Sequence, residues 1–273
     1  MPSSPLARYT LPSRNNARTF ISFHGITDSS VANSDLGHRM SSDFRVILPD
    51  ARGHGMSPDF SAKQLLHPFD TLLEDALNLV KEEISRDTRR RPVVLHGHSM
   101  GGATAAAVAR HHPELVAALI LEDPALFTVE QRARFAATAE PRIRSSERAC
   151  SEPEVVLGEL RQVFPGWSVT DSAGWLFSQA RAREAFLRMA TVDSGEPRGL
   201  VLSALKVPTL LVTGDRDCLF GPEGLREVSH LGNRHLRTAL VPGVRHSVRR
   251  DDPEEFHAAV SGFLRDVVGD VQP

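Results

Sequence analysis

The strongest constraint on the fold of this chain is a serine that lies between glycines at the end of an apolar run. Residues 93–95, Val-Val-Leu, predict a buried strand, and Gly97-His98-Ser99-Met100-Gly101 follows directly after His96. The Ala-rich residues that come next favour a helix. Strand, sharp turn and helix form the context in which a Gly-x-Ser-x-Gly motif holds a serine oxygen clear of the backbone. We therefore take Ser99 as the candidate nucleophile.

Strand and helix patterns alternate on both sides of a central stretch. Short apolar runs predict buried strands, and several of them end in polar loops, at residues 19–23, 44–48, 115–121 and 207–213. Apolar residues recur at three- and four-residue spacing in two segments, residues 68–84 and 253–268, which predicts amphipathic helices. This alternation predicts an α/β fold with a mostly parallel sheet flanked by helices.

The pattern changes over residues 127–204, where Arg- and Ala-rich helical stretches replace the strands. We read this segment as an inserted helical cap, with residues 1–126 and 205–273 forming the core. Its large apolar residues, Trp175 among them, must pack on one another or on the core. The alternative is a set of surface helices with no role at the site.

Composition excludes several classes of function. The 273 residues carry 32 Lys and Arg against 34 Asp and Glu, a formal net charge of -2, so charge gives no case for nucleic acid or an anionic membrane as partner. The two cysteines, Cys150 and Cys218, offer neither a disulfide framework nor metal spacing. No membrane-length apolar run or signal peptide is visible. We expect a soluble, cytoplasmic monomer or homodimer that takes a small-molecule substrate and needs no metal or cofactor.

Five short motifs in order resemble the α/β-hydrolase superfamily over nearly the whole chain outside the cap. They are His24-Gly25, the loop from Asp50 to Ser57, the Ser99 motif, Gly214-Asp215-Arg216-Asp217, and Gly243-Val244-Arg245-His246. The resemblance implies an α/β-hydrolase sheet and a catalytic triad whose nucleophile, acid and base follow in that chain order.

The chemistry of acyl transfer needs the same parts. A serine requires a base, a carboxylate to orient that base, and amide donors where negative charge develops. We assign these roles to Ser99, His246 and Asp217. The oxyanion donors are expected to be the backbone amides of Ile26 and Met100.

The acid has a rival, because Asp123 also leaves a strand at the carboxyl edge and some members of the superfamily place their acid there. Its alternative is a structural bond to a neighbouring loop. Asp215 is expected to cap its own turn by bonding local amides.

Four further residues are candidates for contact with substrate. His98 adjoins the nucleophile, although a packed neighbour is an equal reading. Asp28 and Ser29 are expected near the pocket mouth, or else in a solvated loop. Trp175 belongs to the cap aromatics, which favour an apolar acyl or aryl group.

The sequence thus predicts a serine hydrolase that cleaves a small, apolar ester, thioester or lactone through an acyl-enzyme at Ser99. Within the same class, a cofactor-free carbon–carbon bond hydrolase or a peroxidase-like enzyme stays open. From another class, a non-hydrolytic lyase or cyclase, or a ligand-binding protein, would use the same scaffold.

Overall fold

A seven-stranded sheet forms the centre of the computed structural model, which describes residues 4–12, 17–189 and 191–269. The strand order is β1-β3-β2-β4-β5-β6-β7, and only β1 runs antiparallel to its neighbour, β3. The strands are β1 (Arg8–Leu11), β2 (Thr19–Phe23), β3 (Arg45–Pro49), β4 (Val93–His98), β5 (Val116–Glu122), β6 (Thr209–Thr213) and β7 (Leu236–Leu240). The predicted α/β class and the mostly parallel sheet are confirmed.

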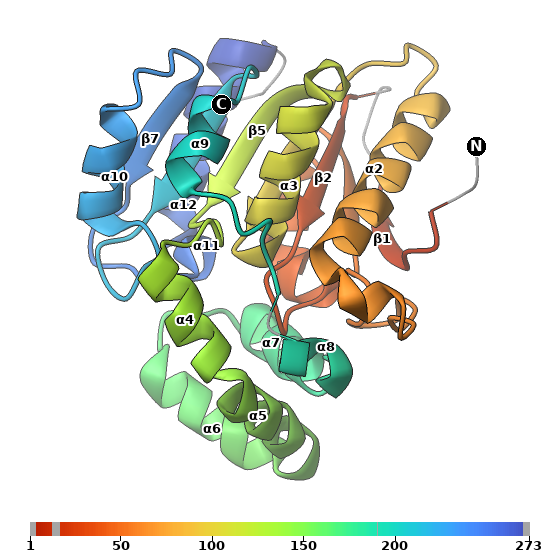
Figure 1. Cartoon of the computed structure of the whole chain (residues 1–273), viewed down its shortest axis with the longest axis vertical. Helices are drawn as coiled ribbons and strands as arrows, with labels where there is room; N and C mark the ends of the chain where they lie inside the picture. Colours follow the sequence, from red (N-terminus) through yellow and green to blue (C-terminus); the bar gives the residue numbers. More distant parts are fainter. Residues whose placement is uncertain (1–3, 13–16, 190, 270–273) are drawn as a thin grey trace.

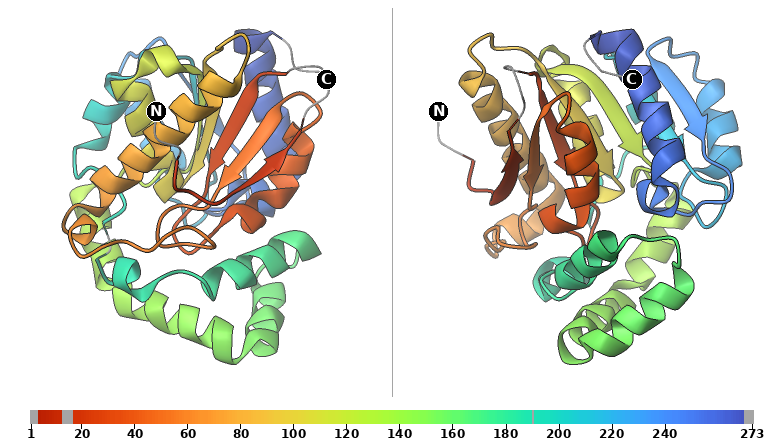
Figure 2. Two further views of the ribbon diagram at one scale, coloured as in Figure 1. Left: turned by 90° about the vertical axis from the view of Figure 1, so that its right-hand side faces the viewer. Right: turned by 180° about the vertical axis from the view of Figure 1, so that it is seen from behind.

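Helices cover both faces of the sheet (Figure 1). One face packs against α2 (Pro68–Arg86), α3 (Met100–His111), α9 (Arg198–Ser203) and α10 (Gly221–Ser229). The other packs against α1 (Ser34–Met40) and α12 (Pro253–Val268), which Figure 2 shows from behind. In the described part of the chain, no helix is long and apolar enough to cross a membrane.

The central strands are buried on both faces, which explains their continuous apolar runs. Every residue of β2, β4 and β6 is buried, whereas the residues of the edge strands β1 and β7 are half-buried or exposed. A parallel sheet covered on both sides has this pattern. It leaves the carboxyl ends of the strands as the exposed edge at which loops collect.

Five helices stand together beyond that carboxyl edge, separate from the layers that cover the sheet (Figures 1 and 2). They are α4 (Val129–Ala137), α5 (Ala139–Ser151), α6 (Pro153–Val163), α7 (Val169–Gln179) and α8 (Glu184–Met189). We call them the cap helices. The last helix of residues 127–204, α9, instead lies with the core, where its buried Val201 and Leu202 belong to the same cluster as α3.

Side-chain hydrogen bonds join the cap helices to loops of the core. The Gln179 amide donates to the hydroxyl of Thr27 at 2.7 Å, and the Ser29 and Ser178 hydroxyls are 2.6 Å apart. At the other side of the cap, Gln131 in α4 donates to the backbone oxygen of Leu219 at 2.6 Å. The loops after β2 and β6 are thereby held to the cap, so the cap is fixed over the carboxyl edge of the sheet.

Candidate active site

Ser99 lies in a strained turn between β4 and α3. Its backbone has φ 51° and ψ -116°, a left-handed conformation that a residue with a side chain adopts only when the surroundings enforce it. The flanking glycines allow the close approach. A Cβ on Gly97 would lie 2.2 Å from the backbone oxygen of Gly101, and one on Gly101 would lie 2.2 Å from that of Phe23. The predicted strand, turn and helix are present, and the Ser99 side chain lies at the start of α3.

The turn after β2 lies against Ser99. A Cβ on Gly25 would come within 3.4 Å of the Ser99 Cβ, so the chain at Ile26 runs beside the nucleophile. Met100 is the first residue of α3, so its amide has no carbonyl one turn earlier to bond. The structure therefore brings both predicted oxyanion donors, Ile26 and Met100, to the neighbourhood of Ser99.

The carboxylate that contacts His246 belongs to Asp123. Nδ1–H of His246 donates to Asp123 Oδ2 at 2.5 Å. The same carboxylate accepts the amides of Leu219 (2.8 Å) and Phe220 (3.0 Å) and the hydroxyl of Thr213 (2.7 Å). Asp123 is completely buried. Four donors thus fix its orientation, and this carboxylate in turn fixes the His246 ring and its tautomer.

The expectation that Asp217 orients His246 is wrong. Asp217 is exposed and has a left-handed backbone with φ 45°. The hydrogen-bond partner of His246 Nδ1 is Asp123. The loop after β6 does contribute, but through backbone: its Leu219 and Phe220 amides bond Asp123. The aspartate at the end of β5, which the sequence left as the alternative, therefore lies where the acid was expected.

Asp215 was expected to bond amides of its own turn, but it bonds an amide of a different loop. Its Oδ1 accepts the backbone amide of Gly243 at 2.8 Å. The contact ties the loop after β6 to the loop that carries His246, so both loops around the Asp123 carboxylate are braced.

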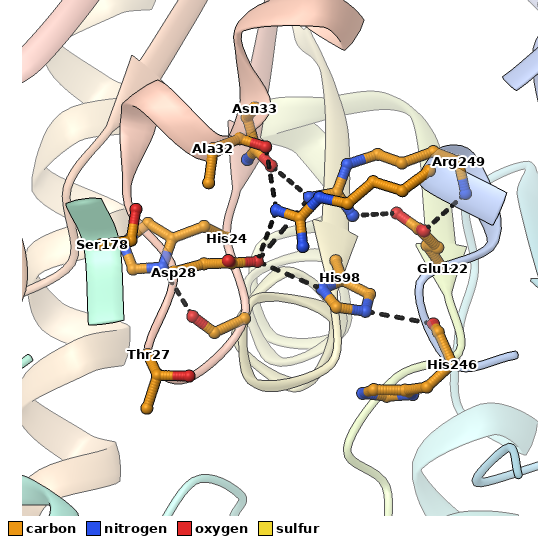
Figure 3. Close-up of polar contacts among 12 residues, drawn as sticks. His24, Thr27, Asp28, Ala32, Asn33, His98, Glu122, Ser178, His246 and Arg249 are labelled. Carbon is orange, nitrogen blue, oxygen red and sulfur yellow. Dashed lines mark hydrogen bonds and ion pairs between the residues drawn. The ribbon is translucent and has the colours of Figure 1, made fainter. Parts of the chain in front are cut away.

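His98 is a packed neighbour that holds the backbone of His246. Its Nε2–H donates to the His246 carbonyl at 3.1 Å, and the two ring centres are 4.7 Å apart. Burial holds the pKa of His98 well below its ordinary value, so the ring is neutral and Nε2 carries its one proton. Figure 3 shows the ring between Asp28 and the backbone of His246.

Asp28 does not lie at a pocket mouth, contrary to expectation. Its side chain is buried, with Oδ2 3.0 Å from the guanidinium of Arg250 and 3.7 Å from that of Arg249. Two cations next to it hold its carboxylate in the interior, where an unpaired charge would be costly. Ser29 is also buried, and its hydroxyl bonds Ser178 of the cap.

Trp175 lies in α7 of the cap and is half-buried. It lines a cavity of about 460 Å³ together with Pro141, Leu160 and Phe164 from the neighbouring cap helices. Its contact with substrate stays a prediction.

Sequence reasoning missed a buried ion-pair network beneath the His246 loop. The Arg249 amide donates to Glu122 Oε1 at 2.9 Å and its Nη1 to Oε2 at 2.8 Å, while Nη2 bonds Asn33. Glu122 is the neighbour of Asp123, and Arg249 follows His246 by three residues in α11 (Val248–Asp251). The network therefore anchors acid and base loops to each other (Figure 3). No sequence signal marks Arg249, because charged residues normally lie at the surface.

The charges around His246 favour its protonated form. Burial lowers the pKa of His246, but the hydrogen bond and charge of Asp123, with smaller contributions from Glu122 and Asp28, outweigh burial and raise it above its ordinary value. A base with this environment binds the proton of a serine hydroxyl more strongly than a free imidazole does.

The described residues contain no set of side chains that could bind a metal ion. Among residues 4–12, 17–189 and 191–269, no group of three or more His, Cys, Asp or Glu side chains is placed to hold a metal ion.

Comparison with known families identifies the class of protein. A family model described as serine aminopeptidase, S33, matches residues 14–199, more than half of the chain. The chain belongs to this family of α/β-hydrolase enzymes. The Ser99 motif lies inside the matched range, whereas His246 lies beyond it.

Individual relatives of this α/β hydrolase are distant but align over most of its length. A 2-(acetamidomethylene)succinate hydrolase of Mesorhizobium japonicum is 26% identical over 254 residues, covering 89% of this chain and 86% of its own. The crystal structure of an E-2-(acetamidomethylene)succinate hydrolase superposes with a TM-score of 0.73 at 22% identity, covering 95% and 94% of the two chains. A malate-bound esterase of Thermogutta terrifontis gives 0.69 at 23% identity, covering 96% and 93%. Both structures have the same fold as this chain.

We predict that Asp123→Asn lowers kcat/KM by about 10³- to 10⁴-fold, because the amide cannot stabilise the imidazolium or fix the correct tautomer. Asp217→Asn is the matched control and stays within about twofold of the wild type. Steady-state kinetics on an activated ester measure both. A large loss in Asp217→Asn with an unaffected Asp123→Asn would contradict the assignment.

The pH dependence follows from the raised pKa of His246. The base must be neutral to accept a proton, so kcat/KM should be low in acid and rise with pH until His246 has lost its proton. The midpoint should lie above about 6.5, the ordinary value for histidine. A pH profile of kcat/KM tests this, and a midpoint at or below 6.5 would refute it.

Proposed function

We propose that this enzyme hydrolyses a small carboxylic ester, thioester or lactone through an acyl-enzyme at Ser99. Two observations carry the proposal: a strained serine at a helix start, and a histidine, packed beside the neighbouring His98, that is fixed on both sides. His98 holds the His246 backbone, and Asp123 holds its ring. A serine held in a tight elbow and a base held in one tautomer are two of the parts that acyl transfer needs.

The reaction proceeds in two halves. His246 takes the Ser99 proton as Oγ bonds the carbonyl carbon, and the oxyanion accepts hydrogen bonds from the Ile26 and Met100 amides. The bond from the carbonyl carbon to the leaving oxygen or sulfur then breaks, and His246 gives the leaving alcohol or thiol its proton. In the second half, water loses a proton to His246 as it attacks the acyl carbon. The bond from that carbon to Ser99 Oγ then breaks, and His246 returns the proton to Oγ as the acid leaves.

The surroundings of the oxyanion turn favour a substrate with an apolar body. Ile26 packs against a cluster of cap residues, Ile143, Ala182 and Leu187, of which Leu187 is fully buried. Apolar side chains that close over the reacting carbonyl exclude water and strengthen the interactions that stabilise the oxyanion. The relatives named as a hydrolase and an esterase are consistent with acyl transfer. The type of carbonyl group and the length of the substrate's acyl chain are part of what we propose.

Intact-mass spectrometry after exposure to a small fluorophosphonate tests this function. The wild type should gain the mass of one adduct, and Ser99→Ala should gain none, because an activated serine is the group that this probe modifies. The probe should be small because Ser99 is only 6% exposed beneath the cap. Adduct formation that persists in Ser99→Ala would contradict the assignment, as would a folded wild type that neither reacts nor hydrolyses a panel of esters, thioesters and lactones.

A further inference from the structure

One arginine of the cap presents a hydrogen-bonding edge without a partner. Arg142 lies near the start of α5, and its Nη1 donates to the Phe135 carbonyl at 2.9 Å and the Thr138 hydroxyl at 2.6 Å. Its Nε and Nη2 are buried, and within the described part of the chain neither has a hydrogen-bond partner. Two buried N–H donors thus point away from the contacts that hold the side chain.

The edge formed by Nε and Nη2 binds a carboxylate at two other arginines of this chain. Arg52 uses these two atoms to bond both oxygens of Asp75, at 2.7 and 3.0 Å. In the cap, Arg132 uses them on Asp193, at 3.3 and 2.7 Å. Two parallel N–H donors match the two oxygens of a carboxylate. Arg142 presents the same fork without a carboxylate from the described residues.

The guanidinium of Arg142 is also a cation without a counter-charge. No acidic side chain among the described residues forms an ion pair with it, and burial alone lowers its pKa. It lies 4.0 Å over the ring of Phe135, whose face stabilises a positive charge. An arginine in protein keeps its proton, so this desolvated charge is costly until an anion joins it.

Packing connects Arg142 to the candidate active site. The ring of Phe135 lies 5.0 Å from that of Phe127, which follows Asp123 by four residues. The next residue along α5, Ile143, belongs to the cap cluster that packs against Ile26. The guanidinium therefore belongs to the part of the cap that adjoins both the acid loop and the oxyanion turn.

We propose that Arg142 binds a carboxylate of the substrate, separate from the carbonyl that Ser99 attacks. The substrate class is then an ester, thioester or lactone with an apolar body and one free carboxylate. A single planar cation neutralises one negative charge through a two-pronged contact, which fits a carboxylate better than a doubly charged phosphate.

This inference rests on the proposed hydrolase function, and a pair of matched substrates tests it. One is the p-nitrophenyl monoester of succinate, which keeps a free carboxylate, and the other is its methyl ester, in which that carboxylate is blocked. The wild type should prefer the free acid in kcat/KM, chiefly through a lower KM. Arg142→Met should reduce that preference by about tenfold to a hundredfold, the usual effect of losing a charged hydrogen bond.

Two variants separate the contact from charge in general. Arg142→Lys keeps the charge without the fork and should retain part of the preference. Arg134→Met removes an exposed charge of α4 and should keep the full wild-type preference. A wild type without preference for the free acid, or an Arg142→Met that keeps the wild-type ratio, would overturn the inference while leaving the hydrolase function intact.

A binding experiment decides the question even if neither ester is hydrolysed, a result that would count against the proposed function instead. Calorimetry on Ser99→Ala compares monomethyl succinate with dimethyl succinate, with and without Arg142→Met. Stronger binding of the monoanion that disappears with Arg142→Met supports the inference. Equal binding of the two compounds, or a difference that survives the substitution, refutes it. Arg142→Gln gives a second neutral variant should the Met variant fold poorly.

Discussion

The carboxylate of Asp123 is the point at which three segments of the chain converge. The end of β5 supplies it, the loop after β6 donates the Leu219 and Phe220 amides, and the loop after β7 brings His246. A buried carboxylate needs such donors, because an ionised oxygen without them is strongly unfavourable away from water. The interaction that orients the base therefore also joins the loops, so geometry for catalysis and stability of the carboxyl edge depend on one group.

Buried ion pairs next to Asp123 stabilise this arrangement. Glu122 holds the amide and side chain of Arg249, and the neighbouring Arg250 is paired with Asp28. Each buried charge here meets an opposite one, whereas Arg142 in the cap does not. Buried ions without partners are costly, and sites that bind charged ligands accept that cost. The contrast between the paired interior and the unpaired cap arginine is what points to an anionic substrate.

The sequence predicted the sheet and the strand, turn and helix around Ser99 because those signals are local. Apolar runs, glycine spacing and helical periodicity act within a few residues. The choice between Asp123 and Asp217 was not local: both follow adjacent strands, and which carboxylate meets His246 depends on how the loop after β6 folds back. The bounds of helix α5, which lies inside the predicted helical segment, are harder to predict because Pro141 and several Ser and Arg residues dilute the apolar pattern. The role of Arg142 is visible only once its neighbours are placed.

The central claim is that Asp123 holds the Nδ1 proton of His246. Proton NMR of the imidazole N–H region tests it most directly, because a hydrogen bond to a carboxylate moves that proton strongly downfield and slows its exchange with water. The wild type and Asp217→Asn should show the downfield signal, and Asp123→Asn should lose it or shift it upfield. A signal that persists unchanged in Asp123→Asn, or that disappears in Asp217→Asn, would contradict the account.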